Sequence, residues 1–298
     1  MSTQTFLAAQ ISSPIFFLYF ALATCRAVGL GNSRQASCAC YSQSISRSTR
    51  QSSFRRVRAC TCTLDEHRVV AIVLLPGMDG SGILFEDFVS QLRAKSIVVC
   101  YPADQPLDYS KLEEFVLAGL PSNEPYILLA ESFSGPIAIG LAARQLPQLR
   151  ALVLVCSFAK APLTLPRLLQ AFLTGLPFWR APVSIAAQLL LGRFRSDRIE
   201  GKLKQAIRAV PSRVWMARMR AVLAVDSTSS LSRIRAPILY LRASEDRVLF
   251  SATSKVISNH VPSTKVVAVE GPHFLLQAKP GESAAAIRTF ANEHGLAL

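Results

Sequence analysis

The sequence predicts an α/β fold with a mostly parallel, doubly wound sheet and a helical insertion. Strand-like apolar runs alternate with helical patterns from residue 65 onward, and reactive side chains follow directly after several of these runs. A chain of 298 residues with 50% hydrophobic content can bury one large core. We expect that core from residues 65–157 and 236–298, a helical cap or lid from residues 158–235, and a leader over residues 1–64.

The leader differs in composition from the rest of the chain. Its 64 residues include no Asp or Glu, seven Arg, eleven Ser and five of the seven Cys. The apolar run Ile15–Ala23 is shorter than the ~20 residues of a membrane-spanning helix. With abundant Ser and Arg, residues 26–64 of the leader cannot bury enough apolar area to offset the entropy of ordering them. We interpret it as a disordered extension, a targeting segment or the product of a start site assigned too early.

The cysteines do not indicate a metal site. Four leader cysteines form two C-x-C pairs: Cys38 with Cys40, and Cys60 with Cys62. This is not the C-x₂-C spacing typical of tetrahedral zinc, so we expect neither a metal nor a cofactor. Cys100 and Cys156 are predicted as buried free thiols at strand ends, which suits a reducing cytoplasm. The alternative location is an organelle or a membrane, reached through the leader.

The first expected strand, Val69–Leu75, leads into the glycine-rich loop Pro76–Gly82. A loop of this kind after an upstream strand can offer a backbone N–H group to the negative oxygen of a tetrahedral intermediate. We assign one such oxyanion-hole donor to Met78 and the second to Phe133.

A serine stands at the bend between the next strand and its helix. Tyr126–Ala130 is expected as a buried strand, and a helix is expected over residues 135–146. A sharp turn of this type, the nucleophile elbow, needs small residues two positions before and after the serine. Ala130 and Ser134 meet this need and single out Ser132. Ser134 is the rival nucleophile, but it would place Pro136 at a small position.

The segment after strand Ala151–Cys156 is expected to form the cap. Its front half is apolar, and its aromatic side chains could line an acyl pocket: Phe172, Phe178 and Trp179. Its back half, residues 193–220, holds nine Lys or Arg against two acidic residues, a net charge of +7. Four of its arginines could attract an anionic substrate portion or an acyl carrier: Arg208, Arg213, Arg218 and Arg220. The alternative is a solvated helix face, and no base-stacking motif indicates nucleic-acid binding.

Two later strands, Pro237–Leu241 and Lys265–Val269, are each followed by a polar loop. The first loop carries Asp246, with Glu245 as the alternative acid, and the second carries His273. The carboxyl ends of parallel strands share one edge of the sheet, so these loops should meet Ser132 there. His273 could then take the serine proton while Asp246 holds the imidazole tautomer.

Together these motifs resemble the α/β-hydrolase superfamily over roughly residues 68–296. The sequence differs from many members in carrying Pro76 where they have histidine and in lacking glycine at both small elbow positions. The resemblance implies the α/β-hydrolase fold and a serine hydrolase that cleaves a carboxylic ester or thioester through an acyl-serine. Acyl transfer and cofactor-free perhydrolysis are alternatives on the same three residues. A catalytically silent hydrolase-like binding protein is the alternative from another class.

We predict that a chain lacking residues 1–64 is soluble and as active on esters as the full chain, because the leader cannot contribute a packed element. Expression of both forms and assay against p-nitrophenyl esters checks this. An insoluble or inactive truncated chain would show that the leader supplies part of the sheet, with Val57–Leu64 as the segment responsible.

Overall fold

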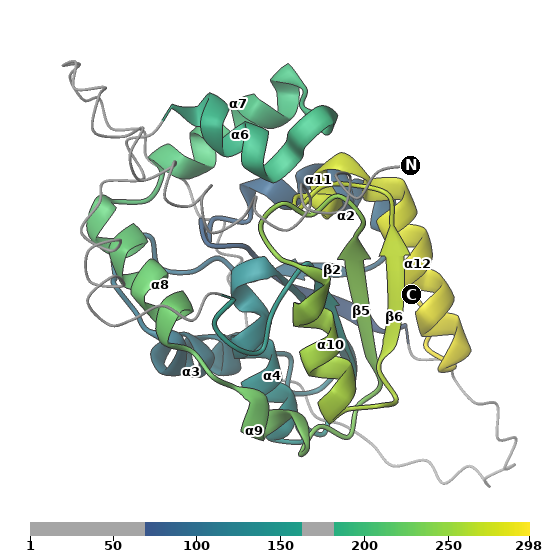
Figure 1. Ribbon diagram of the computed structural model, residues 1–298. Coiled ribbons are helices and arrows are strands. Elements are labelled where there is room, and N and C mark those ends of the chain that lie inside the picture. Colours follow the sequence, from purple (N-terminus) through teal and green to yellow (C-terminus); the bar gives the residue numbers. More distant parts are fainter. Residues whose placement is uncertain (1–68, 163–181) are drawn as a thin grey trace, which may run out of the picture.

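The computed structural model describes residues 69–162 and 182–298, which form an α/β structure around one sheet (Figure 1). Six strands, all parallel, lie in the order β2-β1-β3-β4-β5-β6. The strands are β1 (Ala71–Leu75), β2 (Ser96–Val98), β3 (Tyr126–Glu131), β4 (Leu149–Val155), β5 (Ile238–Ala243) and β6 (Lys265–Val269). The predicted fold class is therefore confirmed.

The central strands are apolar because helices cover both faces of the sheet. All residues of β1 and β3 are buried, whereas the edge strand β6 is only partly buried. An all-parallel sheet needs this double cover, since its crossover helices lie on its faces. Strands that are buried on both faces need apolar residues throughout, which explains the continuous apolar runs that predicted them.

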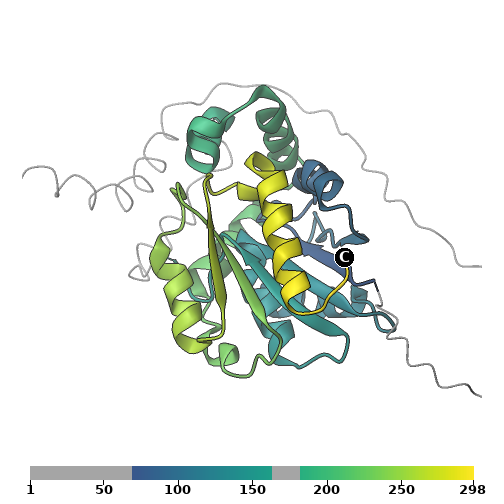
Figure 2. The ribbon, with the colours of Figure 1, turned by 90° about the vertical axis from the view of Figure 1, so that its right-hand side faces the viewer.

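Two groups of helices supply the cover. One face packs against η2 (Ile83–Phe85), α2 (Glu86–Leu92), α11 (Leu275–Ala278) and α12 (Pro280–Glu293). The other face packs against α3 (Tyr109–Gly119), α4 (Gly135–Ala143), α9 (Thr228–Leu231) and α10 (Ser251–His260). Figure 2 shows α12 lying across the first face. Each face thus has its own hydrophobic core.

The strand order places two functional loops next to each other. The chain adds β2 on one side of β1 and then β3 on the other, so the direction of strand addition reverses between β1 and β3. Leu75 at the end of β1 pairs with Ala130 near the end of β3. Ligands of open α/β sheets bind at such a reversal, outside the carboxyl ends of the strands. The loop after β1 and the turn after β3 must therefore lie side by side.

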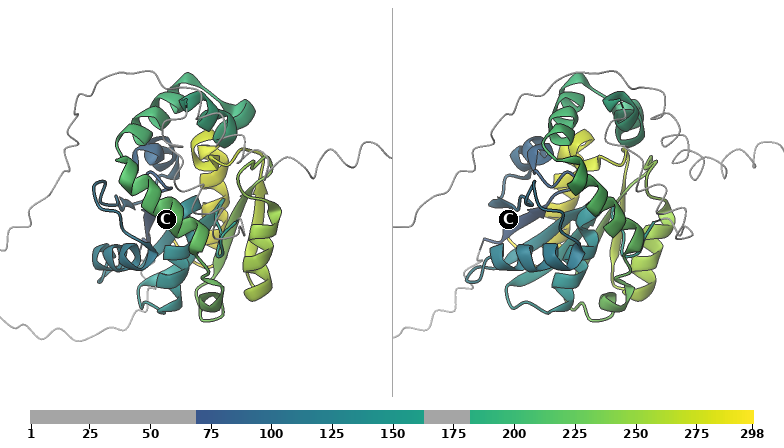
Figure 3. Two further views of the ribbon diagram at one scale, coloured as in Figure 1. Left: turned by 60° about the vertical axis from the view of Figure 1, so that its left-hand side comes forward. Right: turned by 90° about the vertical axis from the view of Figure 1, so that its left-hand side faces the viewer.

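The β4–β5 insertion, residues 156–237, is helical in its described part (Figure 3). It contains α6 (Val183–Leu191), η5 (Gly192–Phe194), α7 (Asp197–Arg208), α8 (Ser212–Ala224) and α9. Helices α6 and α7 pack against Phe274, and α8 packs against Met78, so the insertion contacts loops at the carboxyl edge of the sheet. The predicted pocket residues Phe172, Phe178 and Trp179 lie outside the described residues.

Two details differ from the sequence-based expectation. Helix α4 ends at Ala143 rather than at 146, because Gln145 adopts a left-handed φ of 55°. Cys100 is exposed, not buried: it follows the short edge strand β2, and its Sγ lies 3.1 Å from the Ser81 carbonyl oxygen. Cys156 is buried as expected.

Within residues 69–162 and 182–298, no helix has the length and hydropathy required to cross a membrane.

Replacing Gly135 by Ala should destabilise the fold by about 1–3 kcal/mol, a typical cost of overpacking. An added Cβ would lie 1.9 Å from the Ser157 Oγ and 2.9 Å from the Phe158 carbonyl oxygen. Gly201→Ala on α7 is the control, because its Cβ would meet no atom within 4 Å. The control should gain up to about 1 kcal/mol from helix propensity. Urea unfolding of both variants tests this, and equal stabilities would contradict the packing argument.

Candidate active site

Ser132 occupies a strained turn between β3 and α4. Its φ is +48°, in the left-handed region that residues other than glycine rarely adopt. The turn continues through the 3₁₀ segment η3 (Ser132–Ser134) into α4. Such a strained strand-to-helix turn exposes the serine hydroxyl at the top of the sheet, as predicted from the small residues that flank it.

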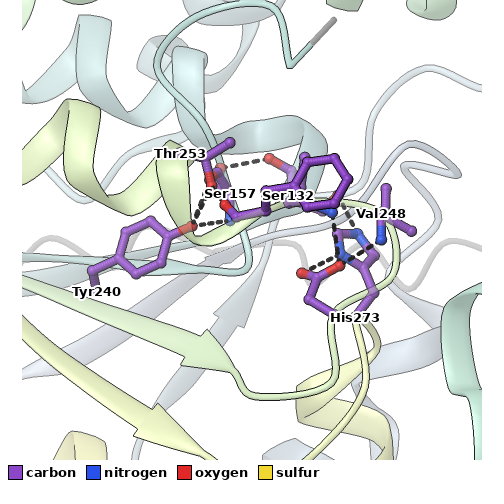
Figure 4. A network of polar contacts seen from close by, with 9 residues as sticks. Ser132, Ser157, Tyr240, Val248, Thr253 and His273 are labelled. Carbon is purple, nitrogen blue, oxygen red and sulfur yellow. Dashed lines mark hydrogen bonds and ion pairs between the residues drawn. The ribbon is translucent and has the colours of Figure 1, made fainter. Parts of the chain in front are cut away.

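A continuous chain of hydrogen bonds links three predicted residues (Figure 4). The Ser132 Oγ lies 2.9 Å from the His273 Nε2, and the His273 Nδ1 lies 2.9 Å from the Asp246 Oδ2. The other carboxylate oxygen of Asp246 accepts the N–H groups of Val248 and Leu249, both at 2.8 Å. The carboxylate is therefore fixed on both sides, and it can hold the imidazole in one orientation.

The acid beside His273 is Asp246 and not Glu245. Glu245 points toward the insertion, where its carboxylate lies 2.5 Å from the Arg193 Nη2. Arg193 also contacts Glu270 at 2.6 Å. The sequence left both acids as candidates because they are adjacent, and the direction of each side chain separates them.

The surroundings of His273 favour its charged form. Burial opposes a positive charge, but the Asp246 carboxylate, its hydrogen bond and the nearby Glu131 outweigh burial and raise the pKa of His273 above its usual value. A histidine in this setting is a stronger base than a free imidazole. It can hold a proton taken from Ser132 and then release it.

Ser134, the rival nucleophile, is committed to the fold. It is fully buried, and its Oγ donates a hydrogen bond to the Pro76 carbonyl oxygen. The Tyr101 hydroxyl lies 2.5 Å from the same Oγ and donates to it. With its single proton used in this way, Ser134 joins the turn after β3 to the loop after β1. This contact explains why a small polar residue stands two positions after Ser132.

The two predicted backbone donors lie on these adjoining loops. Residues 77–80 form a tight turn closed by a 3.0 Å hydrogen bond from the Gly80 N–H to the Gly77 carbonyl oxygen. This bond uses neither the Met78 nor the Asp79 N–H group. The Phe133 ring stacks on Tyr109 at 4.9 Å, and the Tyr109 hydroxyl donates to the Phe133 carbonyl oxygen at 3.0 Å. The Gly80 bond holds the peptide that carries the Met78 N–H, and the peptide that carries the Phe133 N–H is held through the Ser132 carbonyl oxygen, which accepts the Ser157 Oγ.

Ser157 and Tyr240 hold the Ser132 peptide through hydrogen bonds, and neither residue was predicted from the sequence. The Ser157 Oγ donates to the Ser132 carbonyl oxygen at 2.6 Å. The Tyr240 hydroxyl donates to the Ser157 carbonyl oxygen at 2.6 Å and accepts the Ser157 N–H at 3.1 Å (Figure 4). These contacts hold the strained peptide of Ser132. Ser157 lies just after β4, which is a weak sequence signal, whereas Tyr240 lies inside β5 and gave none.

Glu131, the residue directly before Ser132, is buried against the helix that follows His273. It is 3% exposed, and its Oε1 accepts a 3.0 Å hydrogen bond from the Gln277 Nε2 on the helix that follows His273. Burial raises the pKa of Glu131 to about 7, and the Asp79 carboxylate also raises it, while the Gln277 bond and His273 act in the opposite direction. A carboxyl group next to Ser132 therefore changes its charge near neutral pH.

The four basic residues of the predicted substrate site do not share one environment. Arg218, predicted as a substrate-binding residue, is 1% exposed and donates to backbone carbonyl groups, so it offers no exposed charge to attract a substrate. Arg208 is exposed at the end of α7. Arg213 and Arg220 face a surface hollow of about 600 Å³ whose lining does not include Ser132 or His273. That lining consists of Pro106, Asp108, Arg213, Met216, Ala217, Arg220 and Ala221.

Among the residues that the structure describes, no three or more His, Cys, Asp or Glu side chains gather where they could hold a metal ion.

Comparison with known proteins agrees with the geometry. A family model described as the Alpha/beta hydrolase family matches residues 63–286. No curated protein matches the sequence. Similar solved structures include the enol-lactonase of Burkholderia xenovorans LB400, with 13% identity, a TM-score of 0.64, and coverage of 76% of this chain and 94% of that one. A structure from a study of the carboxylesterases of Nitrososphaera gargenis has 14% identity and a TM-score of 0.64, and the match covers 77% of this chain and 92% of that one. A bromoperoxidase of Bacillus anthracis has 15% identity and a TM-score of 0.66, and the match covers 75% of this chain and 92% of that one. At these identities the structures show a shared fold.

Replacing Glu131 by Gln should change how stability depends on pH. The carboxyl pKa is raised from 4.5 to about 7 on folding, so between these values the folded state holds a proton that the unfolded state has lost. The wild type therefore loses stability as pH rises from about 4.5 to 7, by up to about 3 kcal/mol. Glutamine does not titrate and should avoid this loss.

Urea unfolding at pH 5 and pH 8 measures the effect. The Glu131→Gln variant should gain stability over the wild type between the two pH values, with Glu114→Gln on the exposed face of α3 as the control. A constant difference between wild type and variant would contradict the proposed titration.

Proposed function

Because the chain belongs to the alpha/beta hydrolase family, we propose that it is a serine hydrolase that cleaves a carboxylic ester or thioester through an acyl-Ser132 intermediate. The observation that carries this proposal is the unbroken hydrogen-bonded chain from Ser132 through His273 to Asp246. A serine hydroxyl is a weak nucleophile by itself and needs an adjacent base. The hydrogen bonds of His273 to Ser132 and to Asp246 support the proposal that His273 is this base and that Asp246 orients it.

In the first half of the reaction, the Ser132 Oγ attacks the carbonyl carbon while its proton moves to the His273 Nε2. The Asp246 carboxylate stabilises the imidazolium that forms. The carbonyl oxygen becomes an oxyanion, and the N–H groups of Met78 and Phe133 are the proposed donors that stabilise it. Collapse of the tetrahedral species breaks the bond to the leaving alcohol or thiol, which receives the proton from His273.

In the second half, water replaces the leaving group. His273 takes a proton from water, the hydroxide oxygen attacks the acyl carbon, and a second oxyanion forms at the same two donors. Its collapse releases the carboxylic acid and returns the proton to the Ser132 Oγ. Because His273 must be neutral to act as the base, the rate should fall as pH drops through its raised pKa.

The β4–β5 insertion serves in this proposal as the cap that selects the acyl group. Support comes from its helices, which contact the loops on both sides of Ser132: α6 and α7 at Phe274, and α8 at Met78. The acyl pocket residues remain those proposed from the sequence: Phe172, Phe178 and Trp179. Arg208, Arg213 and Arg220 are retained as residues that attract an anionic portion of the substrate.

Acyl transfer and perhydrolysis would use the same three residues, and they differ from hydrolysis only in what attacks the acyl-serine. Product analysis with water, an alcohol or peroxide as the acceptor distinguishes these reactions. The aligned Ser132 and His273 argue against a silent binding protein, because a binding role does not require this alignment.

We predict that Ser132→Ala lowers kcat for p-nitrophenyl esters by at least about 10⁴-fold and abolishes labelling by a fluorophosphonate probe. The fold should remain intact, because alanine removes only one oxygen atom. Ser134→Ala is the comparison variant: it should keep labelling and lose far less activity than Ser132→Ala, while losing about 1 kcal/mol of stability with its buried hydrogen bond.

Esters and thioesters of graded acyl length, assayed with both variants, test this prediction. An active Ser132→Ala variant together with an inactive Ser134→Ala variant would show that Ser134, and not Ser132, is the nucleophile. A wild type that neither reacts with the probe nor hydrolyses any ester would reject the proposed function.

A further inference from the structure

Arg218 joins the insertion to the loop that carries Met78. It lies on α8, it is 1% exposed, and among the described residues it is the largest of the fully buried side chains. Burial lowers its pKa, but a guanidinium group keeps its charge in proteins. Burying such a charge is costly unless polar groups surround it. Something specific must therefore compensate for it at this position.

Backbone carbonyl groups provide the compensation. The Arg218 Nη1 donates to the carbonyl oxygens of Met78 and Asp79, each at 2.8 Å, and its Nη2 donates to that of Pro102 at 3.3 Å. Among the described residues, none of the ion pairs involves Arg218. The guanidinium thus donates to main-chain carbonyl groups, and the Asp79 carboxylate supports its charge only from beyond ion-pair distance.

The loop is shaped to receive this side chain. Gly80 has a left-handed φ of 67°, and a Cβ at that position would lie 2.8 Å from the Arg218 Nη1. The Arg218 guanidinium also lies 5.7 Å from the centre of the Tyr101 ring. A side chain at position 80 would displace the guanidinium, so the glycine and the arginine depend on each other.

These contacts determine where the Met78 N–H points. In a trans peptide the N–H and the C=O point in opposite directions. The Gly77 carbonyl accepts the Gly80 N–H inside the turn, so the Met78 N–H of the same peptide points away from the turn. Arg218 holds the next two peptides through the Met78 and Asp79 carbonyls. Three consecutive peptide planes are therefore fixed.

We propose that Arg218 is a positioning residue, which holds residues 77–80 so that the Met78 N–H is aimed at the oxyanion before substrate arrives. This inference rests on the proposed function. A preorganised donor stabilises the transition state without reorganisation during the reaction. The loss of Arg218 should therefore affect the transition state more than the binding of substrate.

The test compares Arg218→Met, which removes all three hydrogen bonds, with Arg218→Lys, which keeps a charge but not the fork of donors. Arg288→Met is the matched control. The Arg288 Nη1 also donates to two backbone carbonyls, those of Gln91 and Leu92, but on the far side of the fold between α12 and α2. Active sites are counted by fluorophosphonate labelling to completion, so that every rate refers to folded protein.

Arg218→Met should lower kcat per labelled site by about 10- to 100-fold, with KM changed by less than about threefold. A misplaced oxyanion donor should lower kcat by no more than the complete loss of that donor, which is about 10²- to 10³-fold. A trifluoromethyl ketone, which forms a tetrahedral oxyanion on the serine, should lose affinity by the same factor. The acid limb of the pH profile should not move, because His273 and Asp246 are unchanged. Arg218→Lys should lie between wild type and Arg218→Met, and Arg288→Met should match the wild type in kcat and ketone affinity.

Two results would overturn the inference. If both Arg218 variants have lower melting temperatures but wild-type kcat and ketone affinity per labelled site, Arg218 only stabilises the fold, and the proposed function stands. If the wild type itself does not react with the fluorophosphonate, the proposed function and this inference fail together. Should Arg218→Met not fold, Arg218→Lys decides by the same measurements.

Discussion

The left-handed backbone of Ser132 is the constraint on which the site depends. A residue with a side chain adopts φ near +48° only when its surroundings hold it there. The Ser157 hydroxyl holds the Ser132 carbonyl, and Ser134 ties the far side of the turn to Pro76. Gly135 leaves room for Ser157 beneath the turn. Residues that follow β1 and β4 therefore hold the turn after β3, and the Ser132 hydroxyl lies against His273.

The reversal of strand order between β1 and β3 supplies the second half of the site. It brings the loop of Met78 beside the turn of Ser132, and two polar contacts then fix that loop. Ser134 holds it from the core through Pro76, and Arg218 holds it from the insertion. The nucleophile and its proposed oxyanion donors are positioned by hydrogen bonds from three separate parts of the chain.

The charges of His273 and Glu131 are set by different causes: pairing with Asp246 favours the charged form of His273, and burial favours the neutral form of Glu131. The Asp246 carboxylate accepts three hydrogen bonds and favours a protonated His273. Glu131 lies close to the same centre, and burial keeps it neutral until pH reaches about 7. A neutral Glu131 adds no negative charge where the oxyanion would form, whereas an ionised one opposes it. The Glu131 contact with Gln277 also connects the serine turn to the helix after His273.

The sequence by itself determined the α/β fold, five of the six strands within about two residues, and the loops that hold Ser132, Asp246 and His273. It could do so because buried parallel strands leave continuous apolar runs, and their carboxyl ends must share one edge of the sheet. Only the tertiary structure decided the environments of Glu131 and Arg218. Arg218 stands 140 residues from its partner at Met78 in a basic segment typical of a surface. Burial of a charged side chain depends on which distant elements pack around it, and that information is not local in sequence.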